Sequence, residues 1–475
     1  MPIQDTDSQK IKSIFEKQQA FATEISNTTS RDRVQKLEKI ESYLLDQSNQ
    51  QRLKDALSAD LRKPEVEAMT SEIGVLLKSI KDIKSNLRGW MSDKSVSTPL
   101  VFFGSSSYVH YEPKGVALII SPWNYPFQLC INPLLYAIAA GCTAMLKPSE
   151  YSEHTSTYIA KMITELFEEK EVAVCQGAIP TSEALLKLPF DHMYFTGSPT
   201  VGRIVMKAAS EHLSSVTLEL GGKSPCIVDE SVNIDKAAKS LVWGKFFNAG
   251  QTCIAPDYVL VNSKIHDQFV AAIAKQITKM FNPEGKGIQQ SPDLARLISS
   301  KHFEKVESLL SDAVEKGADV VTGGFSDAED RYIEPTVLTK VPDGVDLLHE
   351  EIFGPIMPVL KYDKLEEALE YIRRKPKPLA FYILSKNSKN INHIIKQSTA
   401  GGTVINDFLI HFANHNLPFG GVNYSGIGKS HGRHGFLAFS NERSVMRSRI
   451  GFSSLLYPPY SGLSRKVANL MGRWI

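Results

Sequence analysis

The sequence has no excess of charge of either sign. Its 54 Lys and Arg residues are balanced by 52 Asp and Glu residues, so the formal net charge is +2 over 475 residues. Such a balance gives no overall field that would hold a phosphate backbone or an anionic membrane. Nucleic acid is therefore not the expected partner.

Cysteine is also scarce. The five cysteines, Cys130, Cys142, Cys175, Cys226 and Cys253, are odd in number and far apart, and no two have C-x-x-C spacing. This argues against a disulfide framework or a zinc site and favours a reducing compartment. The N-terminal segment MPIQDTDSQK carries two acids before any apolar run, unlike a signal peptide. We expect a cytoplasmic protein.

Formal charge is absent from one long stretch, residues 115–146. The stretch is longer than the about 20 apolar residues that a spanning helix needs. It nevertheless contains Pro122, Asn124 and Pro126, whose unpaired backbone and amide groups are costly in lipid. The sequence therefore predicts a buried strand (GVALII), a Pro-rich loop (SPWNYP) and a buried helix to about Ala140, with no transmembrane span.

The order of the remaining segments is typical of an α/β protein. At about 150 residues per domain the length suggests two or three domains, and 42% hydrophobic with 22% charged residues is ordinary for a globular chain. Helical periodicity covers residues 31–90. Short apolar runs then alternate with helical patterns from 115 to about 228, ending in PCIVD, and again from 258 to 407. This alternation predicts two doubly wound domains with mostly parallel sheets.

The C-terminal tail follows a Pro-rich turn, YPPYS. It places Val467, Leu470, Met471 and Trp474 on roughly one helical face. The segment is too short to span a bilayer. Two interpretations stay open: the tail packs on the body of the protein, or it touches a membrane surface.

Two motifs suggest a nucleotide site, each weakly by itself. FTGSPTVGR places a Gly-Ser turn between an apolar strand and a helix, where backbone N–H groups and the positive helix end favour a pyrophosphate. Its glycines, Gly197 and Gly202, do not have G-x-G-x-x-G spacing, so a tight structural turn is at least as consistent. The motif LKPSE places Lys147 and Glu150 at the end of a strand, where they could bind the hydroxyls of a ribose. The alternative is a surface turn with a solvated charge pair.

Three further residues suggest reactive chemistry. Cys253 lies in NAGQTCIAP, a predicted loop between a helix ending near Phe247 and the next strand, although most cysteines are small buried hydrophobes. Glu219 lies near the end of an apolar strand. If its carboxyl group is buried, its pKa is raised and suits a general base. The alternative is an ordinary residue at a strand end that faces water and has no function. The side-chain amide of Asn124 could donate a hydrogen bond that stabilises an oxyanion. The alternative is that Asn124 only forms the turn, which is common for this residue type.

A group of histidines has spacings typical of metal ligands. These are His411, His415, His431 and His434. No carboxylate or cysteine follows them at a matching interval, and the segment is rich in Gly, Asn and Pro. We therefore predict no metal site.

Together these motifs resemble the NAD(P)-dependent aldehyde dehydrogenase superfamily. The similar segments are PWNYP, LKPSE, FTGSPTVG, LELGGKSP, GQTC, EEIFGP and PFGGVNYSGIGK, within about residues 115–430. The segment NDFLIHFANHNLPFGGVNYSGIGKSHGRHGF and the YPPY tail resemble the class 3 branch, which includes fatty-aldehyde and aromatic-aldehyde dehydrogenases.

The resemblance implies a role for each motif residue. Cys253 corresponds to the nucleophile, Glu219 to the general base and Asn124 to the oxyanion donor. The implied cofactor contacts are Trp123 and Ser198 at the pyrophosphate, Gly197 and Gly202 in the same turn as Ser198, Lys147 and Glu150 at the adenosine ribose, and Glu351 and Phe353 at the nicotinamide ribose.

The resemblance also implies an organisation into domains. The expected parts are a Rossmann-like NAD(P)-binding domain at residues 1–94 and 114–220, a catalytic α/β domain at 221–424, a small bridging segment at 95–113 and 425–450, and a tail at 451–475. Members of the class 3 branch are typically dimers joined through the bridging segment, so we expect a homodimer.

The expected reaction is oxidation of an aldehyde to a carboxylic acid. The Cys253 thiolate adds to the carbonyl, the adduct expels hydride to the nicotinamide, and Glu219 activates the water that hydrolyses the thioester. A water-activating carboxylate favours a free acid over transfer to coenzyme A. The alternative is a catalytically silent nucleotide-binding, redox-sensing or structural relative, which would not require Cys253, Glu219 and Asn124 together.

The expected cofactor is NAD, because Glu150 would repel the 2′-phosphate of NADP; NADP is the alternative. The expected substrate is a long-chain or aromatic aldehyde. Apolar residues in the motif loops would line its tunnel, although they are equally consistent with plain core: Tyr125, Phe408, Ile410, Phe412 and Phe419.

Overall fold

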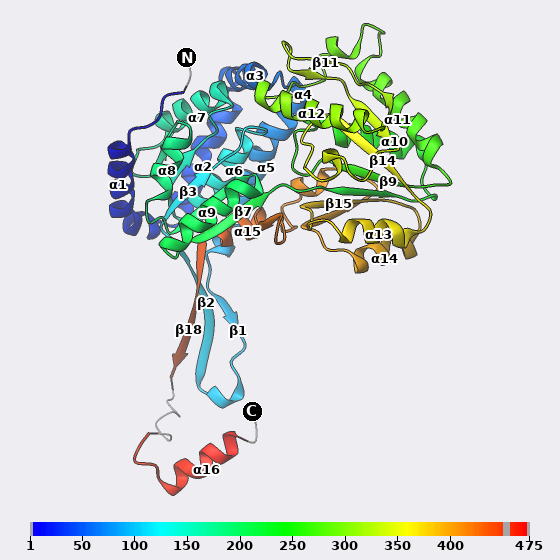
Figure 1. The fold of residues 1–475 in the computed structure, drawn as a ribbon. Coiled ribbons are helices and arrows are strands. Elements are labelled where there is room, and N and C mark those ends of the chain that lie inside the picture. Colours follow the sequence, from blue (N-terminus) through cyan, green and yellow to red (C-terminus); the bar gives the residue numbers. More distant parts are fainter. Residues whose placement is uncertain (1–2, 450–456, 473–475) are drawn as a thin grey trace.

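Two α/β lobes lie side by side, and a narrow arm projects away from them (Figure 1). The structure is a computed structural model that describes residues 3–449 and 457–472. The tail residue Trp474 lies outside the described residues. The predicted α/β class with two doubly wound sheets is confirmed.

The first lobe contains a six-stranded sheet in the order β17-β7-β6-β3-β4-β5. All neighbouring strands are parallel except β17 and β7. The strands are β3 (Val116–Ile120), β4 (Thr143–Lys147), β5 (Val172–Val174), β6 (His192–Gly197), β7 (Ser215–Leu220) and β17 (Gly426–Ile427). Continuous apolar runs such as VALII form these strands because helices cover both faces.

Alternate residues of β3 show how the two faces are buried. Ala117 and Ile119 pack in one core cluster, and Val116 and Leu118 pack in another. The helices of the first cluster are α2 (Ser30–Leu45), α3 (Gln47–Leu61), α5 (Gly74–Trp90), α6 (Gln128–Ala140), α7 (Glu153–Leu166) and α15 (Gly432–Ala438). Those of the second are α1 (Ser8–Ser26), α8 (Ile179–Leu186) and α9 (Pro199–Glu211).

The carboxyl end of β3 is the point where the strand order reverses. Ile120 lies opposite Lys147 of β4 on one side and Phe195 of β6 on the other. The chain continues outward from β3 in both directions, first through β4 and β5 and then through β6 and β7. Doubly wound sheets bind ligands in the crevice at this switch point. The loops after β3 and β6 therefore flank the expected binding crevice.

The second lobe contains a seven-stranded sheet in the order β10-β13-β14-β9-β8-β15-β16, parallel except for β10. Its strands are β8 (Pro225–Val228), β9 (Tyr258–Asn262), β10 (Asp319–Thr322), β13 (Thr336–Thr339), β14 (Ile356–Tyr362), β15 (Ala380–Leu384) and β16 (Gly402–Ile405). The PCIVD run, which the alternating pattern grouped with the first series, therefore belongs here. It pairs with β9 and β15, a contact that local sequence does not encode.

Helices also cover both faces of the second sheet. They are α10 (Ile234–Phe246), α11 (His266–Phe281), α12 (Ser300–Glu315), α13 (Leu365–Arg373) and α14 (Ser388–Gln397). A two-stranded ribbon, β11 (Ser326–Asp327) and β12 (Tyr332–Ile333), lies outside this sheet. Tyr382 packs in the cluster with α10 and α11, while the next residue, Ile383, packs with α13 and α14.

The uncharged stretch 115–146 folds as predicted, into β3, a loop, α6 and β4. The helical region before it is less regular than the sequence predicts. Between the short α4 (Glu65–Glu67) and α5, the chain forms a π-helical turn over Ala68–Ile73. Such turns occur often at functional sites.

The arm is a three-stranded antiparallel sheet in the order β1-β2-β18. Its strands are β1 (Lys94–Val96), β2 (Ser105–Pro113) and β18 (Ser440–Ser448), and the tail forms α16 (Gly462–Met471) beyond it (Figure 1). Across residues 3–449 and 457–472, no helix is both long and apolar enough to cross a membrane.

Candidate active site

Asn124 lies in the loop between β3 and α6 and is buried. Its Nδ2 donates to the carbonyl oxygen of Gln251 at 2.9 Å. Its own carbonyl accepts from Lys63 Nζ at 3.0 Å and from Asn248 Nδ2 at 2.9 Å. An amide nitrogen carries two hydrogens, so one N–H of Asn124 remains for a ligand.

Cys253 lies in the predicted loop between α10 and β9 and is half-buried. The loop begins with three residues in the left-handed region, Asn248 and Ala249 with φ of 53° and Gly250 with φ of 75°. A Cβ at Gly250 would lie 2.3 Å from the carbonyl oxygen of Gly354. Only glycine therefore allows this loop to pack against the EEIFGP segment.

Glu219, the penultimate residue of β7, is 6% exposed and does not face water. Ser430 Oγ donates to its Oε1 at 2.8 Å. The other oxygen, Oε2, is buried without a partner among the described residues. Burial raises the pKa of Glu219 to about 8, while the hydroxyl of Ser430 and the charge of Lys429 oppose that rise.

These loops enclose a cavity of about 230 Å³ between the two lobes. The predicted site residues in its walls are Trp123, Asn124, Gly197, Ser198, Glu219, Cys253, Glu351 and Phe353. His302 and Lys305, on α12, also line it and were not predicted. His302 Nε2 contacts the carbonyl oxygen of Phe353 at 2.8 Å, and the His302 ring lies 5.0 Å from that of Trp123. No local motif marks these two residues, because only packing of α12 brings them here.

Burial disfavours the charged forms of the reactive groups in this cavity. Burial raises the pKa of the Cys253 thiol well above its usual range, and the carboxyl groups of Glu351 and Glu219 raise it further. Burial also raises the pKa of Glu351 to about 8. A thiol in this state is a weak nucleophile until a base or a nearby positive charge favours the thiolate.

Cys253 also lines a second, apolar cavity of about 360 Å³. Its apolar and aromatic lining includes Val66, Val75, Tyr125, Trp243, Phe247, Ile254, Leu409, Ile410 and Phe412. Of the five residues predicted to form a substrate tunnel, only Tyr125, Ile410 and Phe412 are in this wall.

Two of the predicted tunnel residues are placed elsewhere. Phe408 is fully buried in the core, where its ring lies 4.7 Å from that of Tyr382 and directly against Gly244. Phe419 lines a separate cavity of about 30 Å³, which Glu219 and Cys253 also border. Aromatic character alone does not distinguish core from cavity wall, so the prediction for these two residues is wrong.

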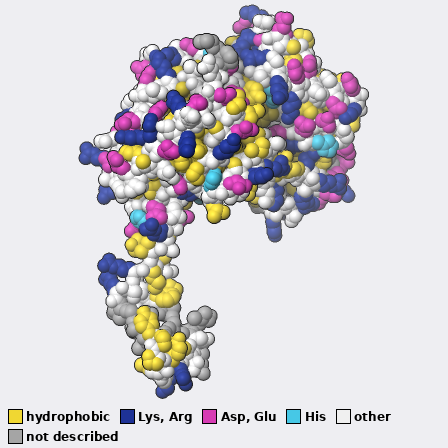
Figure 2. All heavy atoms as spheres, turned by 60° about the vertical axis from the view of Figure 1, so that its left-hand side comes forward, with side chains coloured by type: hydrophobic (Ala, Val, Ile, Leu, Met, Phe, Trp, Pro, Cys, Tyr) yellow, Lys and Arg dark blue, Asp and Glu magenta, His cyan; other side chains and the backbone are white. Residues whose placement is uncertain are grey.

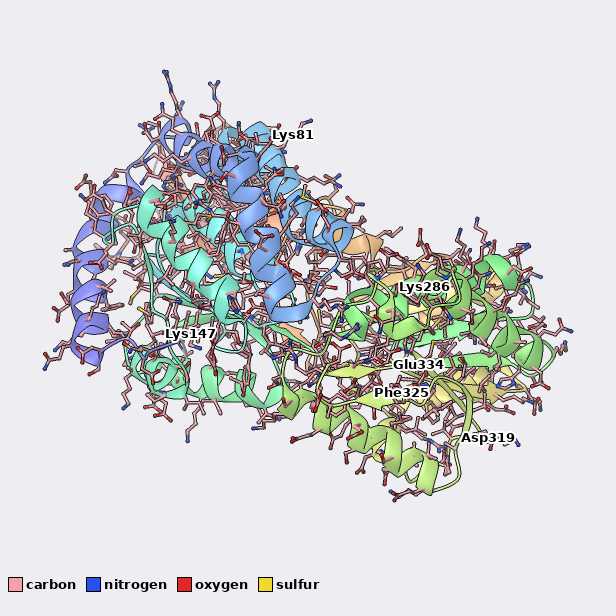
Figure 3. All side chains as sticks on the ribbon, turned by 90° about the horizontal axis from the view of Figure 1, so that it is seen from above. Lys81, Lys147, Lys286, Asp319, Phe325 and Glu334 are labelled. Atoms are coloured by element: carbon pink, nitrogen blue, oxygen red, sulfur yellow. The ribbon has the colours of Figure 1, made fainter. Side chains whose placement is uncertain are left out.

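Three predicted cofactor residues are not in the wall of the 230 Å³ cavity. Lys147, at the carboxyl end of β4, is buried and its Nζ pairs with Glu150 Oε2 at 2.7 Å. It lies in the first lobe, whereas Phe325 and Glu334 lie in the second (Figure 3). Gly202 packs α9 against β7, since a Cβ there would meet Leu220 Cδ2 at 2.7 Å.

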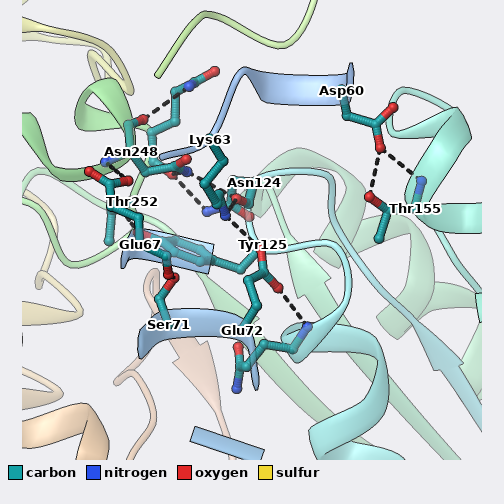
Figure 4. Close-up of polar contacts among 12 residues, drawn as sticks. Asp60, Lys63, Glu67, Ser71, Glu72, Asn124, Tyr125, Thr155, Asn248 and Thr252 are labelled. Carbon is teal, nitrogen blue, oxygen red and sulfur yellow. Dashed lines mark hydrogen bonds and ion pairs between the residues drawn. The ribbon is translucent and has the colours of Figure 1, made fainter. Parts of the chain in front are cut away.

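A buried ion pair supports the loop of Asn124. Lys63 Nζ lies 2.6 Å from Glu72 Oε1, and both side chains are fully buried (Figure 4). The same ammonium lies 4.2 Å from the ring centroid of Tyr125, whose hydroxyl is 2.6 Å from Thr252 Oγ1. The pair thus contacts the loops of both Asn124 and Cys253. This ion pair was not predicted from the sequence. Its signal in the sequence was Glu72, a charged residue next to the apolar positions of the helical segment after Pro64.

A second buried carboxyl group holds the start of the Cys253 loop. Glu67 Oε2 accepts from the backbone N–H of Asn248 at 2.9 Å (Figure 4). Burial raises the pKa of Glu67 to about 8, and the charge of Lys63 opposes this.

The histidines of the C-terminal motif pack among aromatic rings. His411 contacts the ring of Phe419, His431 contacts the rings of Phe412 and Phe419, and His415 stacks on His431. In the part of the chain that the structure describes, no group of three His, Cys, Asp or Glu residues could hold a metal ion.

Known proteins resemble this chain over most of its length. A profile of the aldehyde dehydrogenase family matches residues 1–445. The 4,4'-diaponeurosporen-aldehyde dehydrogenase of Staphylococcus aureus is 45% identical over 434 residues, 91% of this chain and 92% of that protein. Aldehyde dehydrogenase family 3 member A2 of Macaca fascicularis is 40% identical over 437 residues, 91% of this chain and 87% of that protein.

Solved structures show the same similarity. Staphylococcus aureus AldH in its substrate-bound state has a TM-score of 0.91 and 42% identity, covering 97% of this chain and 99% of that one. A Mycobacterium tuberculosis aldehyde dehydrogenase complexed with NAD+ has a TM-score of 0.84 and 27% identity, covering 93% of this chain and 90% of that one.

Lys63→Met tests the buried ion pair. We expect it to lower the free energy of unfolding by about 3–5 kcal/mol, because it leaves the Glu72 charge buried and unpaired. The matched control is Lys54→Met, which breaks a pair whose partner Glu65 is 71% exposed and should cost less than about 1 kcal/mol. Urea unfolding of both variants measures the difference. Equal costs would contradict a structural role for the buried pair.

Proposed function

Because the chain belongs to the aldehyde dehydrogenase family, we propose that it oxidises long-chain or aromatic aldehydes to carboxylic acids with Cys253 as the nucleophile. It is an NAD(P)-dependent aldehyde dehydrogenase. The observation that carries the residue-level proposal is the position of Cys253 in the walls of both cavities, one lined by polar groups and one almost wholly apolar.

The residues of the 230 Å³ cavity fit a nicotinamide dinucleotide. Ser198 caps the N-terminus of α9, a helix of 13 residues whose first-turn N–H groups suit a pyrophosphate. Thr196 Oγ1 lines the cavity and is buried with no partner among the described residues, so it is available to a ligand. Glu351 would hold ribose hydroxyls, with Trp123 and Phe353 beside them. When bound, the oxidised nicotinamide accepts a hydride from the substrate carbon.

Cys253 and Asn124 would act in the first half of the reaction. The aldehyde enters from the apolar cavity, and the Cys253 sulfur adds to its carbonyl carbon. The free N–H of the Asn124 amide and a backbone N–H stabilise the resulting oxyanion. The hydrogen bond from Asn124 to Gln251 fixes that amide before the charge develops.

Glu219 would act in the second half. Its Oε2 has no partner among the described residues and lies in a cavity wall shared with Cys253. A carboxylate there takes a proton from water, which attacks the thioester on Cys253 and releases the carboxylic acid. A pKa near 8 makes it a stronger base than an exposed carboxylate.

Cys253→Ala and Glu219→Gln separate the two halves. Cys253→Ala should abolish NADH formation from an aldehyde, because no covalent adduct can form. Glu219→Gln should still give NADH in a single turnover but release acid at least about 100-fold more slowly, since loss of a general base typically costs that much. Rapid-quench analysis of NADH and free acid measures both. Full acid release from Glu219→Gln would contradict its assignment as general base, and NADH formation by Cys253→Ala would contradict the assignment of Cys253 as nucleophile. A wild-type protein that forms no NADH from any aldehyde would favour the silent-relative alternative.

We assign NAD as the preferred cofactor. Glu150 lies at the carboxyl end of β4, next to the switch point, where an adenosine ribose is expected. Its carboxylate pairs with Lys147 but remains 29% exposed on its side chain. A 2′-phosphate placed beside it would be repelled.

Glu150→Gln tests this preference. We expect the ratio of kcat/KM for NADP to kcat/KM for NAD to rise roughly fivefold. This corresponds to the loss of about 1 kcal/mol of repulsion between the carboxylate and the 2′-phosphate. Glu153→Gln, which removes a charge from the first turn of α7, is the control and should leave the ratio unchanged. A wild-type enzyme that already prefers NADP would refute the assignment.

The apolar cavity supports the substrate class. Its wall contains Tyr125, Trp243, Phe247 and Phe412, and it opens next to Cys253. Burial of each methylene of a chain contributes about 0.8 kcal/mol. An aldehyde that fills the cavity therefore binds better than a short polar one.

A series of unbranched aldehydes tests this. We expect kcat/KM to rise by up to about fourfold per methylene until the cavity is filled. Val75→Phe, which narrows the cavity from α5, should reduce kcat/KM for decanal far more than kcat/KM for propanal. Propanal is the control, because a general loss of activity would lower both values equally. A maximum at acetaldehyde would exclude the long-chain proposal.

The arm and tail support an assembly of two copies. We assign the arm strands β1, β2 and β18 as the bridging segment between the cofactor domain (1–94 and 114–220) and the catalytic domain (221–424). The expected range 425–450 is too wide, because β17 pairs with β7 and α15 packs in the core of the first lobe. Hydrophobic and basic side chains crowd the arm and tail (Figure 2), including the exposed Val96, Leu100, Phe102, Met446, Leu463 and Leu470. All five cysteines are free, which favours a location in the reducing cytoplasm. The C-terminal tail could make a peripheral contact with a membrane.

A further inference from the structure

We propose that Ser430 and His431 are positioning residues that hold the carboxylate of Glu219 for hydrolysis of the thioester. The proposal rests on the proposed function and extends it to the C-terminal histidine motif. Neither residue would touch the substrate. Both would act through Glu219, by fixing which of its oxygens is available to water.

A chain of hydrogen bonds carries the proposal. Ser430 Oγ donates to Glu219 Oε1 at 2.8 Å, and His431 Nδ1 lies 2.9 Å from the same Oγ. With His431 Nδ1 as the donor, the hydroxyl hydrogen of Ser430 is left for an oxygen acceptor, and Glu219 Oε1 at 2.8 Å is nearer than the carbonyl oxygen of Phe419 at 3.3 Å. Oε1 is thus occupied while Oε2 stays free, which is the arrangement that a general base needs.

The backbone around Ser430 is clamped on both sides. Its N–H donates to the carbonyl oxygen of Phe419 at 2.6 Å, and its carbonyl accepts from the N–H of Phe419 at 3.1 Å. The N–H of Gly432 donates to Tyr136 Oη at 2.8 Å. His431, between them, has a φ of 71°, a conformation that non-glycine residues adopt rarely. Such strain is typical of residues held in place for function.

The cavity of about 30 Å³ lies at the end of this chain. Glu219, Cys253, Ser430 and His431 all line it. That volume admits a water molecule but little more. Four of its lining residues carry a buried polar atom with no partner among the described residues: Asn132 Oδ1, Thr196 Oγ1, Glu219 Oε2 and His431 Nε2. These atoms would hold a water within reach of both Glu219 and the carbon bound to Cys253.

The charges around Glu219 are few. The titratable groups that interact with Glu219 or border the 30 Å³ cavity are Lys429, Tyr194, Cys253 and His431. Lys429 Nζ donates to the carbonyl oxygen of Gly421 at 3.1 Å. Burial raises the pKa of Tyr194 well above its usual range, so it stays neutral. Lys429 is therefore the single cation among these groups, and Ser430 supplies the hydrogen bond that favours the charged carboxylate.

The neutral imidazoles exclude a simple proton relay. Burial lowers the pKa of His431 to about 3 and that of His411 to about 4, and it also lowers the pKa of His415, on which Asp82 and Lys78 act in opposite directions. Transfer of a proton from Glu219 to His431 would be strongly uphill. A role through hydrogen bonding is consistent with these values, and a role as proton carrier is not.

Ser430→Ala in the full-length enzyme tests the proposal, with Ser425→Ala as the matched control. Ser425 is buried in the same segment, but its hydroxyl bonds only to the backbone of Val422. Single-turnover NADH formation and rapid-quench release of free acid are followed across pH. In the wild type, acid release should increase with pH through about 8, because Glu219 accepts a proton only after it has lost its own.

Loss of the Ser430 hydroxyl removes a hydrogen bond that favours the carboxylate. We expect the acid limb of acid release to move up by about one pH unit, with about tenfold slower release at pH 7. NADH formation should change less than about twofold, since a hydrogen bond to Glu219 does not touch the thiol. Ser430→Thr, which keeps the hydroxyl, should restore the wild-type limb, and Ser425→Ala should not shift it.

An unshifted acid limb in Ser430→Ala, or an equal slowing of NADH formation and acid release, would overturn the proposal. Glu219→Gln keeps this outcome distinct from failure of the proposed function. If Glu219→Gln abolishes acid release while Ser430→Ala behaves as wild type, the general base stands and the positioning role falls. If Glu219→Gln releases acid normally, the general-base role itself falls.

Discussion

The hydrogen bond from the Asn124 amide to the Gln251 carbonyl joins the two lobes at the reactive sulfur. One partner lies in the loop after β3 of the first sheet, and the other lies two residues before Cys253. Lys63 and Asn248 both donate to the carbonyl of Asn124, so the same loop is held from three sides. A displacement of this loop would move the oxyanion donor and the nucleophile together. Buried side-chain hydrogen bonds to backbone carbonyls therefore fix the oxyanion donor relative to the nucleophile.

Buried charge makes this arrangement specific. Lys63 and Glu72 are fully enclosed, and each needs the other because an unpaired buried ion is costly. The ammonium reaches its second acceptor, the Asn124 carbonyl, only when the π-helical turn and the SPWNYP loop adopt their observed positions. Satisfying one ion pair thus selects one conformation for the loops around it.

The order of strands and loops could be predicted from the sequence because each depends on local pattern. Apolar runs bounded by Gly and Pro identified both sheets, and the loops that carry Asn124 and Cys253 fall where the turn residues are. Contacts between distant elements could not be predicted in this way. His302 reaches the cavity because α12 packs beside Phe353, and PCIVD joins the second sheet because it pairs with β9 and β15. Phe408 and Phe419 failed as tunnel residues for the same reason: both are aromatic residues of the same loop region, and only packing decides which wall each one forms.

The three cavities around Cys253 explain why the product would be a free acid. A dinucleotide in the 230 Å³ cavity and an acyl chain in the 360 Å³ cavity would block the two wide approaches to the thioester carbon. The 30 Å³ cavity also borders Cys253, and Glu219 is in its wall. It has room for water and excludes a thiol as bulky as coenzyme A. The choice of acyl acceptor would then follow from cavity size, and the raised pKa of Glu219 would matter because water, unlike a thiol, needs a base near neutral pH.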